Sequence, residues 1–347
     1  MNLLGSKRLS IFSLILTIVL LVSCSGDSIP STSTAPPAQE AISSSTPYPT
    51  LLPTNTPKNT RQPARIIIPT WTPIPTKLPE PMPTSIQNQA SSSCDSSGRV
   101  EIGRFPSTIV GSDKDYRIYF PPCYGQDGRT YPTIYLFHGG AHTDEHWINL
   151  GIDKVVEEMI ENGDIPPILI VMPDGGELAN NSSGGTRSFE GLFVDELLPF
   201  IETNFCAWSE PAGRAIGGIS RGGYWALEIA FRNPELIASV GGHSAALLDT
   251  DAGPKTNPQE TALTNDLGDL RIYFDIGQQD WLINEIQDLH VDMSEAGVQH
   301  TWVLNEGQHV EEYWSDHLEE YLEWYAQPWP SDRDSYPLCI LESGGPE

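Results

Sequence analysis

The pentapeptide Gly-Ile-Ser-Arg-Gly at residues 218–222 places Ser220 between an apolar run, RAIGGI, and a helical pattern, GGYWALEIAF. A serine on a tight turn between a buried strand and a helix exposes its hydroxyl, and flanking glycines relieve the crowding at such a turn. The N-terminus of the helix adds a positive dipole and free N–H groups. We therefore predict that Ser220 is a nucleophile. The alternative is an ordinary strand–helix turn.

A serine hydroxyl attacks only when a base takes its proton, and the base in this arrangement follows an acid in the chain order Ser, Asp/Glu, His. His309 lies in a loop between an apolar run, TWVLN, and the last helical pattern, so it is the predicted base. His243 follows the run IASVGG and is the alternative base or a residue lining the pocket, although it precedes every plausible acid. The other histidines after Ser220 fall in helices or at the start of a strand: His290, His300 and His317.

The acid should lie just beyond the end of a strand, where its carboxylate can orient an imidazole. Asp280 is the third residue after the run LRIYFDIG and is the predicted acid. Glu285, at the turn into the next helix, is the second choice. Asp275 lies inside the strand, so its side chain should be buried or point away from the site.

Stabilising an oxyanion takes two backbone donors. One should be the N–H of Arg221, the residue after the nucleophile, and the other should come from the sequence His-Gly-Gly-Ala at 138–141. Gly140 is the first candidate there and Ala141 the second. We expect His138 to brace this loop by hydrogen bonding rather than to take part in chemistry.

Three histidines in the same region are spaced four residues apart, as metal ligands on one helix face can be. They are His138, His142 and His146. Gly139 and Gly140 interrupt any helix here, and His138 ends a strand, so we expect no metal and no cofactor.

Apolar strands alternate with helical patterns along the rest of the chain, which predicts a mostly parallel sheet with helices on both faces. Residues 99–105 and 116–120 alternate like the strands of an antiparallel hairpin at its edge. The further strands are expected at 133–138, 168–172, 214–219, 237–242, 270–276 and 301–304, and the helices at 152–162, 193–204, 222–232, 285–296 and 312–325. Ligands of such sheets bind at the carboxyl ends of the strands.

The N-terminus has the features of an export signal. Lys7 and Arg8 precede a short apolar run that ends in Leu-Val-Ser-Cys at 21–24, a tetrad that resembles the lipobox of bacterial lipoproteins. The resemblance implies that residues 1–23 form a signal peptide and that Cys24 is lipidated, giving an exported protein on the extracytoplasmic side of a membrane. The alternative is an ordinary secretory signal.

Residues 24–93 differ in composition from the rest of the chain. Ser, Thr and Pro make up 36 of the 69 residues from 25 to 93, which is typical of a segment that cannot bury a core. We expect a disordered stalk here and one α/β domain over 94–347. The formal net charge of −27 argues against nucleic-acid binding, and membrane contact is expected through the lipid anchor alone.

The four remaining cysteines suggest two disulfides in an exported protein. The predicted hairpin brings Cys94 and Cys123 to the same open end, which leaves Cys206 to pair with Cys339.

Several stretches together resemble the putative esterase family of α/β-hydrolases, which includes feruloyl and acetylxylan esterases, enterochelin esterases, S-formylglutathione hydrolases and mycolyltransferases. They are YRIYFPPCY, YPTIYLFHGG followed by Trp147, ILIVMPDGG, GISRGGYWAL, IGQQD and EGQHVEEYW, and they span about residues 95–326. The pair Tyr313-Trp314 is similar to the tryptophan that follows the catalytic histidine in relatives. Arg221 departs from the Met or Gln that is more usual after the serine, and the polar loop between Gly176 and Gly191 is of a kind that varies with substrate.

The resemblance implies an α/β-hydrolase fold and a catalytic triad of Ser220, Asp280 and His309, with Arg221 and Gly140 as oxyanion donors. His243, Trp147 and Trp314 are the candidates for residues that line the pocket. The expected function is a serine carboxylic-ester hydrolase that acts through an acyl-enzyme on an ester substrate, such as feruloyl or acetyl esters of polysaccharide. The alternatives are acyl transfer of the mycolyltransferase type and a non-catalytic cell-surface binding module.

Overall fold

The computed structural model describes residues 97–248 and 252–341. Their centre is an eight-stranded sheet in the order β1-β2-β4-β3-β5-β6-β7-β8. The strands are β1 (Arg99–Phe105), β2 (Lys114–Phe120), β3 (Thr133–Phe137), β4 (Leu169–Pro173), β5 (Arg214–Ile219), β6 (Ser239–His243), β7 (Arg271–Gly277) and β8 (Thr301–Asn305). At one edge of the sheet, β1 pairs antiparallel with β2, and β2 pairs antiparallel with β4. All the other pairings, from β4 to β8 in the sheet order, are parallel. The predicted α/β-hydrolase sheet with its N-terminal hairpin is confirmed.

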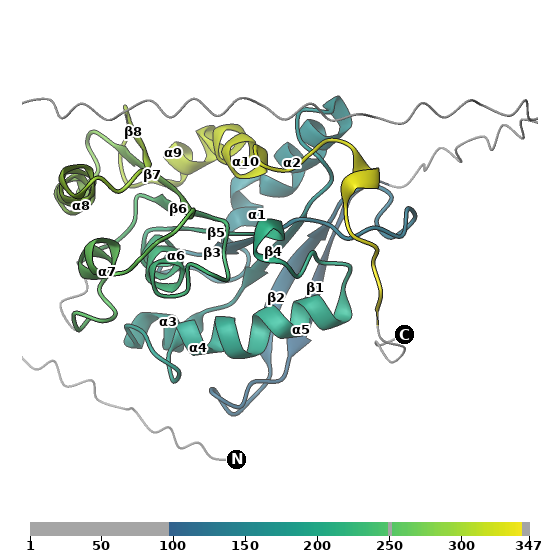
Figure 1. The fold of residues 1–347 in the computed structure, drawn as a ribbon, viewed down its shortest axis with the longest axis horizontal. Helices are drawn as coiled ribbons and strands as arrows, with labels where there is room; N and C mark the ends of the chain where they lie inside the picture. Colours follow the sequence, from purple (N-terminus) through teal and green to yellow (C-terminus); the bar gives the residue numbers. More distant parts are fainter. Residues whose placement is uncertain (1–96, 249–251, 342–347) are drawn as a thin grey trace, which may run out of the picture. The chain divides into compact units, whose positions relative to one another are not determined.

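Helices cover both faces of the sheet (Figure 1). One buried cluster lies under α1 (His146–Leu150), α2 (Ile152–Asn162), α9 (Glu311–Asp316) and α10 (Leu318–Ala326). The other cluster lies under α4 (Phe189–Gly191), α5 (Leu198–Asn204), α6 (Arg221–Arg232), α7 (Pro258–Thr264) and α8 (Ile283–Ala296). The short α3 (Gly176–Asn181) follows β4. The interior strands are apolar on both sides because both of their faces are covered in this way.

Two helices differ from the prediction. The helix expected at 312–325 is divided at His317 into α9 and α10, because the His317 ring bonds the Tyr313 carbonyl at 2.6 Å and the backbone leaves the helical path there. The helix expected at 193–204 begins earlier, at Phe189, and passes through a π-helical turn, Leu192–Leu197, before α5. α1, α3 and α7 were not predicted, since each has only five to seven residues and so shows no clear periodicity.

The C-terminal segment around Cys339 is held at two places, by Cys206 and by the residues that lead into β3. Cys206 and Cys339 form a disulfide with a Cα–Cα distance of 5.3 Å, as predicted. Beside it, the N–H of Cys339 donates to Gly128 and that of Thr130 to Pro337. The predicted pairing of Cys123 with Cys94 involves a residue outside the described part of the chain.

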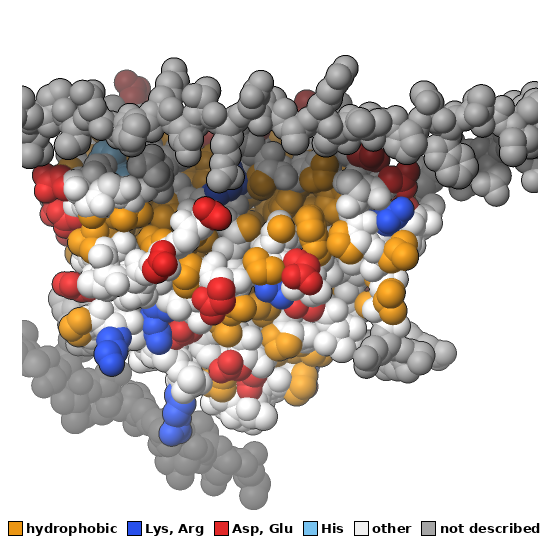
Figure 2. Space-filling view, viewed as in Figure 1, with side chains coloured by type: hydrophobic (Ala, Val, Ile, Leu, Met, Phe, Trp, Pro, Cys, Tyr) orange, Lys and Arg blue, Asp and Glu red, His pale blue; other side chains and the backbone are white. Residues whose placement is uncertain are grey.

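Acidic side chains are scattered over the face seen in Figure 2, and the basic side chains there are separated from one another. Within the described residues, no helix has the length and apolar character needed to cross a membrane.

Helix α6, which begins directly after Ser220, carries a buried carboxyl group. Glu228 is fully buried, and one of its oxygens accepts a hydrogen bond from Arg232 at 2.8 Å. Arg232 also pairs with Glu190. The second oxygen of Glu228 has no hydrogen-bond partner in residues 97–248 and 252–341. Burial, together with the nearby Glu190 carboxylate, raises the pKa of Glu228 to about 8.

This shift predicts a pH-dependent stability. Between pH 4.5 and about 8, the folded protein keeps a proton on Glu228, whereas the unfolded chain, in which this group has its ordinary pKa of 4.5, has lost it. The free energy of unfolding should therefore fall as the pH rises from about 4.5 to about 8. Glu228→Gln removes this titration, so its melting temperature relative to wild type should increase across that window in thermal scans by circular dichroism. The exposed Glu235→Gln is the control, and a pH-independent difference for Glu228→Gln would contradict the shift.

Candidate active site

Ser220 lies between β5 and α6 with φ = 56° and ψ = −116°, a backbone conformation that non-glycine residues rarely adopt. Neighbouring backbone holds this turn, since the N–H of Ser220 donates to the His243 carbonyl at 3.0 Å and its carbonyl accepts from Ala246 at 2.9 Å. A Cβ at Gly218 would collide with the backbone of Gly222. Gly218 is thus required by the close approach of the two ends of the pentapeptide, whereas a Cβ at Gly222 would collide with the backbone of Phe137.

The structure brings Ser220, His309 and Asp280 together. His309 Nε2 lies 3.0 Å from Ser220 Oγ, and His309 Nδ1 lies 2.9 Å from Asp280 Oδ2. Asp280 is buried, and its other oxygen accepts from the N–H of Leu282 at 2.9 Å. A carboxylate only accepts hydrogen bonds, so Nδ1 of His309 carries the proton and Nε2 presents its lone pair to the hydroxyl. This tautomer is the one that a general base needs.

The loops that carry Asp280 and His309 follow adjacent strands, β7 and β8. The N–H of Gln278 donates to the Asn305 carbonyl at 2.8 Å, and that of Gln279 donates to Gly307 at 2.9 Å. These bonds hold the two loops against each other. Glu285, the second choice for the acid, lies in the first turn of α8, and one of its oxygens is buried without a partner in the described part of the chain.

His243 does not line the pocket, so that expectation is wrong. Its ring is fully buried, with Nδ1 2.7 Å from Asp275 Oδ1 and Nε2 3.0 Å from the hydroxyl of Tyr325. Asp275 Oδ2 accepts from the hydroxyls of Tyr313 and Tyr321 at 2.8 and 2.7 Å. Burial and the Asp275 carboxylate raise the pKa of both tyrosines. His243 does lie at the carboxyl end of a strand, as predicted, but its side chain points into a buried polar network that sequence spacing does not show.

Histidine side chains form hydrogen bonds with the backbone of the loop after β3. The N–H of Gly139 donates to His146 Nδ1 at 3.2 Å, and the Gly139 carbonyl accepts from His138 Nδ1 at 2.7 Å. His138 Nε2 in turn accepts from Gly175 at 2.8 Å, so His138 braces the loop as predicted. The N–H groups of Gly140 and Ala141 have no hydrogen-bond partner among the residues that the structure describes. They are therefore available to an oxyanion.

Arg221, the residue after Ser220, directs its guanidinium to the polar segment after β4. Nε donates to the Ala179 carbonyl at 2.9 Å, a terminal nitrogen donates to Ser182, and the cation lies 4.4 Å from the ring centre of Tyr224. The charge of Arg221 thus holds the segment that includes α3. The sequence did not indicate this contact, since about forty residues separate Arg221 from these partners.

A cavity of about 390 Å³ lies beside Ser220. Its lining includes Gly140, His142, His309, Glu311 and Trp314. The Trp314 ring meets the His309 ring edge-on at 4.9 Å and donates from Nε1 to Ser244 at 3.3 Å, so its predicted position at the pocket agrees with the structure.

Trp147 is buried, and its Nε1 donates to the Phe137 carbonyl at 3.1 Å. The expectation that Trp147 lines the pocket is therefore wrong. Its indole packs beneath β3 and supports the strand that leads into the 138–141 loop.

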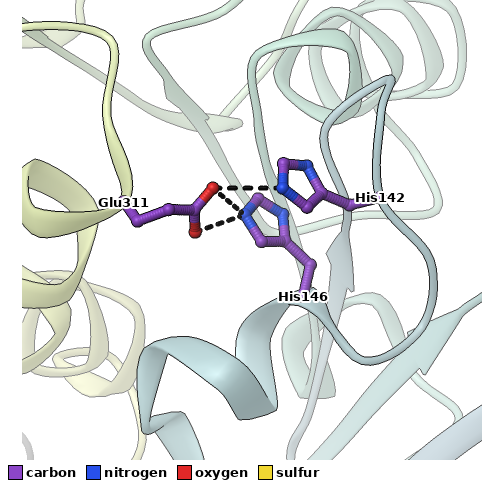
Figure 3. Close-up of side chains that lie close together, drawn as sticks. All are labelled: His142, His146 and Glu311. Carbon is purple, nitrogen blue, oxygen red and sulfur yellow. Dashed lines mark hydrogen bonds and ion pairs between the residues drawn. The ribbon is translucent and has the colours of Figure 1, made fainter.

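One group of potential metal ligands is found within residues 97–248 and 252–341, and it lies in the same cavity. It consists of His142, His146 and Glu311, and the carboxylate of Glu311 faces both rings (Figure 3). His138 is not part of it, so the histidine trio considered from the sequence is not assembled. Glu311 was missed, although its position two residues after His309 places it at the site.

Comparisons with known proteins identify the family of this chain. The family model described as putative esterase matches residues 107–327. An esterase of Mycobacterium tuberculosis is 38% identical over 159 residues, which are 43% of this chain and 33% of that protein. An endo-1,4-beta-xylanase/feruloyl esterase of Xylanibacter ruminicola is 30% identical over 155 residues, which are 42% of this chain and 21% of that protein. The chain thus matches about a third or less of the length of these relatives.

Solved structures share the fold at lower identity. A ferulic acid esterase has a TM-score of 0.62 and 22% identity, with 67% of this chain and 100% of the other chain covered. The S-formylglutathione hydrolase of Staphylococcus aureus has a TM-score of 0.56 and 17% identity, with 67% and 97% covered. The family model spans most of the described residues and the sheet is that of an α/β-hydrolase, so the chain belongs to the putative esterase family.

Proposed function

We propose that the protein is a serine esterase, a carboxylic-ester hydrolase that works through an acyl-enzyme. The observation that carries this proposal is the His309 ring, which lies within hydrogen-bond distance of both Ser220 Oγ and Asp280 Oδ2. Nucleophile, orienting acid and base follow the chain order expected for this fold. Membership of the putative esterase family supports the same reaction class.

In the proposed reaction, Ser220 Oγ attacks the ester carbonyl carbon while its proton passes to His309 Nε2. The carbonyl oxygen becomes an oxyanion that accepts hydrogen bonds from the N–H groups of Gly140 and Arg221. Asp280 stabilises the imidazolium, which gives its proton to the departing alcohol and leaves an acyl-enzyme. Water then attacks the acyl group with His309 as base, and the acid leaves with Ser220 restored.

We propose feruloyl or acetyl esters of polysaccharide as the substrate class. The names of the Xylanibacter relative and of the ferulic acid esterase structure support this choice. The volume of the cavity beside Ser220 is typical of small-molecule sites. The net charge of −27 favours neutral esters over anionic ones.

We also propose that the protein is exported and anchored by a lipid on Cys24, outside the described residues. The support is the Leu-Val-Ser-Cys tetrad after a basic and apolar leader. The composition of residues 25–93 would then make them a stalk between the membrane and the esterase domain.

The first prediction in this subsection concerns the triad. Ser220→Ala should abolish labelling by a fluorophosphonate probe and hydrolysis of p-nitrophenyl acetate and methyl ferulate. Asp280→Asn should lower kcat by up to ~10⁴-fold, since the amide favours the wrong imidazole tautomer. Circular dichroism controls for folding. Full labelling of Ser220→Ala would refute the proposal, whereas binding of polysaccharide without any ester hydrolysis by wild type would favour a binding module.

The second prediction separates the two histidines. His309→Ala should lose nearly all activity with a smaller change in the free energy of unfolding than His243→Ala, because its ring lies at the cavity and water can take its place beside Asp280. His243→Ala should lower the free energy of unfolding by about 2 kcal/mol or more, since it leaves Asp275 short of a partner and opens a cavity. Urea titration and kcat per labelled serine measure the two effects. A stable but inactive His243→Ala beside an active His309→Ala would reverse the assignment.

The third prediction concerns the anchor. Cys24→Ala should release the protein from membranes or leave the leader uncleaved, because the acylated thiol is removed. Fractionation after metabolic labelling with a fatty acid measures both, with Ser28→Ala as the control for a substitution near Cys24 that removes no thiol. Fatty-acid labelling that persists in Cys24→Ala would contradict the anchor.

A further inference from the structure

The carboxylate of Glu311 joins the loop of the predicted base to the loop of the predicted oxyanion donors. Its oxygens lie 3.0 and 3.3 Å from His146 Nε2 and 3.1 Å from His142 Nε2 (Figure 3). Glu311 comes from the start of α9, two residues after His309, and His146 comes from the start of α1. Neither Glu311 nor His146 has a part in the proposed chemical steps.

The hydrogen bonds of His146 define its tautomer. Nδ1 accepts the N–H of Gly139 at 3.2 Å, so a neutral ring carries its proton on Nε2, which then donates to Glu311. Burial, together with the adjacent His142, lowers the pKa of His146 to about 4, and the ring is therefore neutral at pH 7. The result is a chain of hydrogen bonds from Gly139 through His146 to Glu311.

This chain determines what the loop after β3 can offer a substrate. The carbonyl of Gly139 is already bonded to His138 and to the N–H of His142, and the carbonyl of Gly140 accepts from Asn180 at 2.9 Å. With the N–H of Gly139 also bonded, the first free donor in the described loop is the N–H of Gly140. The bond to His146 thus restrains the peptide next to that donor.

We propose that Glu311 and His146 are positioning residues, which hold the Gly139 peptide so that the following N–H groups face the carbonyl oxygen of a bound ester. The inference rests on the proposed esterase function. An oxyanion donor acts mainly in the transition state, so its misplacement should lower kcat while leaving KM almost unchanged.

A metal ion bound by the same three side chains fits the structure less well, for two reasons. The rings of His142 and His146 are parallel, with an interplanar angle of 2° and centres 3.7 Å apart, so an ion shared by both Nε2 atoms would lie outside the plane of each ring. A histidine ligand also normally donates from its second nitrogen to an acceptor. The second nitrogen of His146 instead faces an N–H group.

The test compares three variants of the full chain on p-nitrophenyl acetate. Glu311→Ala should lower kcat by about 10- to 100-fold with KM within about twofold, because small displacements of catalytic groups carry penalties of that size. Glu311→Gln keeps an acceptor for His146 Nε2 and should restore kcat to within about threefold of wild type. Glu312→Ala removes the same charge from the next, exposed residue of α9 and should match wild type.

Two further measurements make the outcome decisive. Inhibition by a trifluoromethyl ketone, whose adduct with serine carries an oxyanion, should weaken in parallel with kcat in Glu311→Ala. A wild-type kcat in Glu311→Ala, or a change confined to KM, would overturn the inference. Zinc binding in a 1:1 ratio, measured by calorimetry after EDTA dialysis and lost in both Glu311→Ala and His142→Ala, would overturn it in favour of a metal site.

The Ser220 and Glu311 variants distinguish a failure of the esterase function from a failure of the positioning role. An active Ser220→Ala would remove the proposed function, and the positioning role with it. An inactive Ser220→Ala beside an unchanged Glu311→Ala would remove only the positioning role.

Discussion

The close approach of the loops after β7 and β8 is the constraint on which the site depends. A Cβ at Gly277 would overlap the backbone of Gly307, and Gly307 itself has φ = 144°, which is outside the range that other residues readily adopt. Only with glycine at both positions can the two loops exchange backbone hydrogen bonds and bring His309 to Asp280. The geometry of the imidazole is therefore determined by backbone packing as much as by the side chains.

Below these loops, a buried polar network joins the helical layer to the sheet. Asp275, inside β7, receives hydrogen bonds from Tyr313 on α9 and Tyr321 on α10 and contacts His243 on β6. A buried carboxylate without partners would be strongly unfavourable, so each of these bonds restricts where α9 and α10 can lie. Helix α9 also carries Glu311 and Trp314, and the network thus helps to define one wall of the cavity.

The sequence was most informative where local chemistry and chain order act together. The turn at Ser220, the loop position of Asp280 and the loop position of His309 follow from strand ends and glycine placement, and the structure brings their side chains together. The hairpin and the parallel strands follow from apolar runs and alternation. These features depend on residues that are neighbours in the chain.

Most of the errors concern contacts between residues far apart in the chain, and one concerns a local side-chain bond. His243 lies opposite Asp275 in the β6–β7 register, but no local pattern shows that the His243 side chain points into the interior, as was expected of Asp275. No local pattern shows that Trp147 is buried either. Glu311 meets His146 across 165 residues, and the break at His317 arises from a side-chain bond within one turn of a helix whose apolar spacing continues.

The disulfide between Cys206 and Cys339 has a topological consequence for this site. It closes a covalent ring around every residue from 206 to 339, and Ser220, Asp280 and His309 all belong to that ring. A single cut of the backbone anywhere within it leaves both fragments linked by a covalent bond. In the reduced protein, the same cut would leave the serine and the histidine joined by packing alone if it fell between them. The bond lies outside the catalytic groups, yet it keeps all three in one molecule when the chain is nicked.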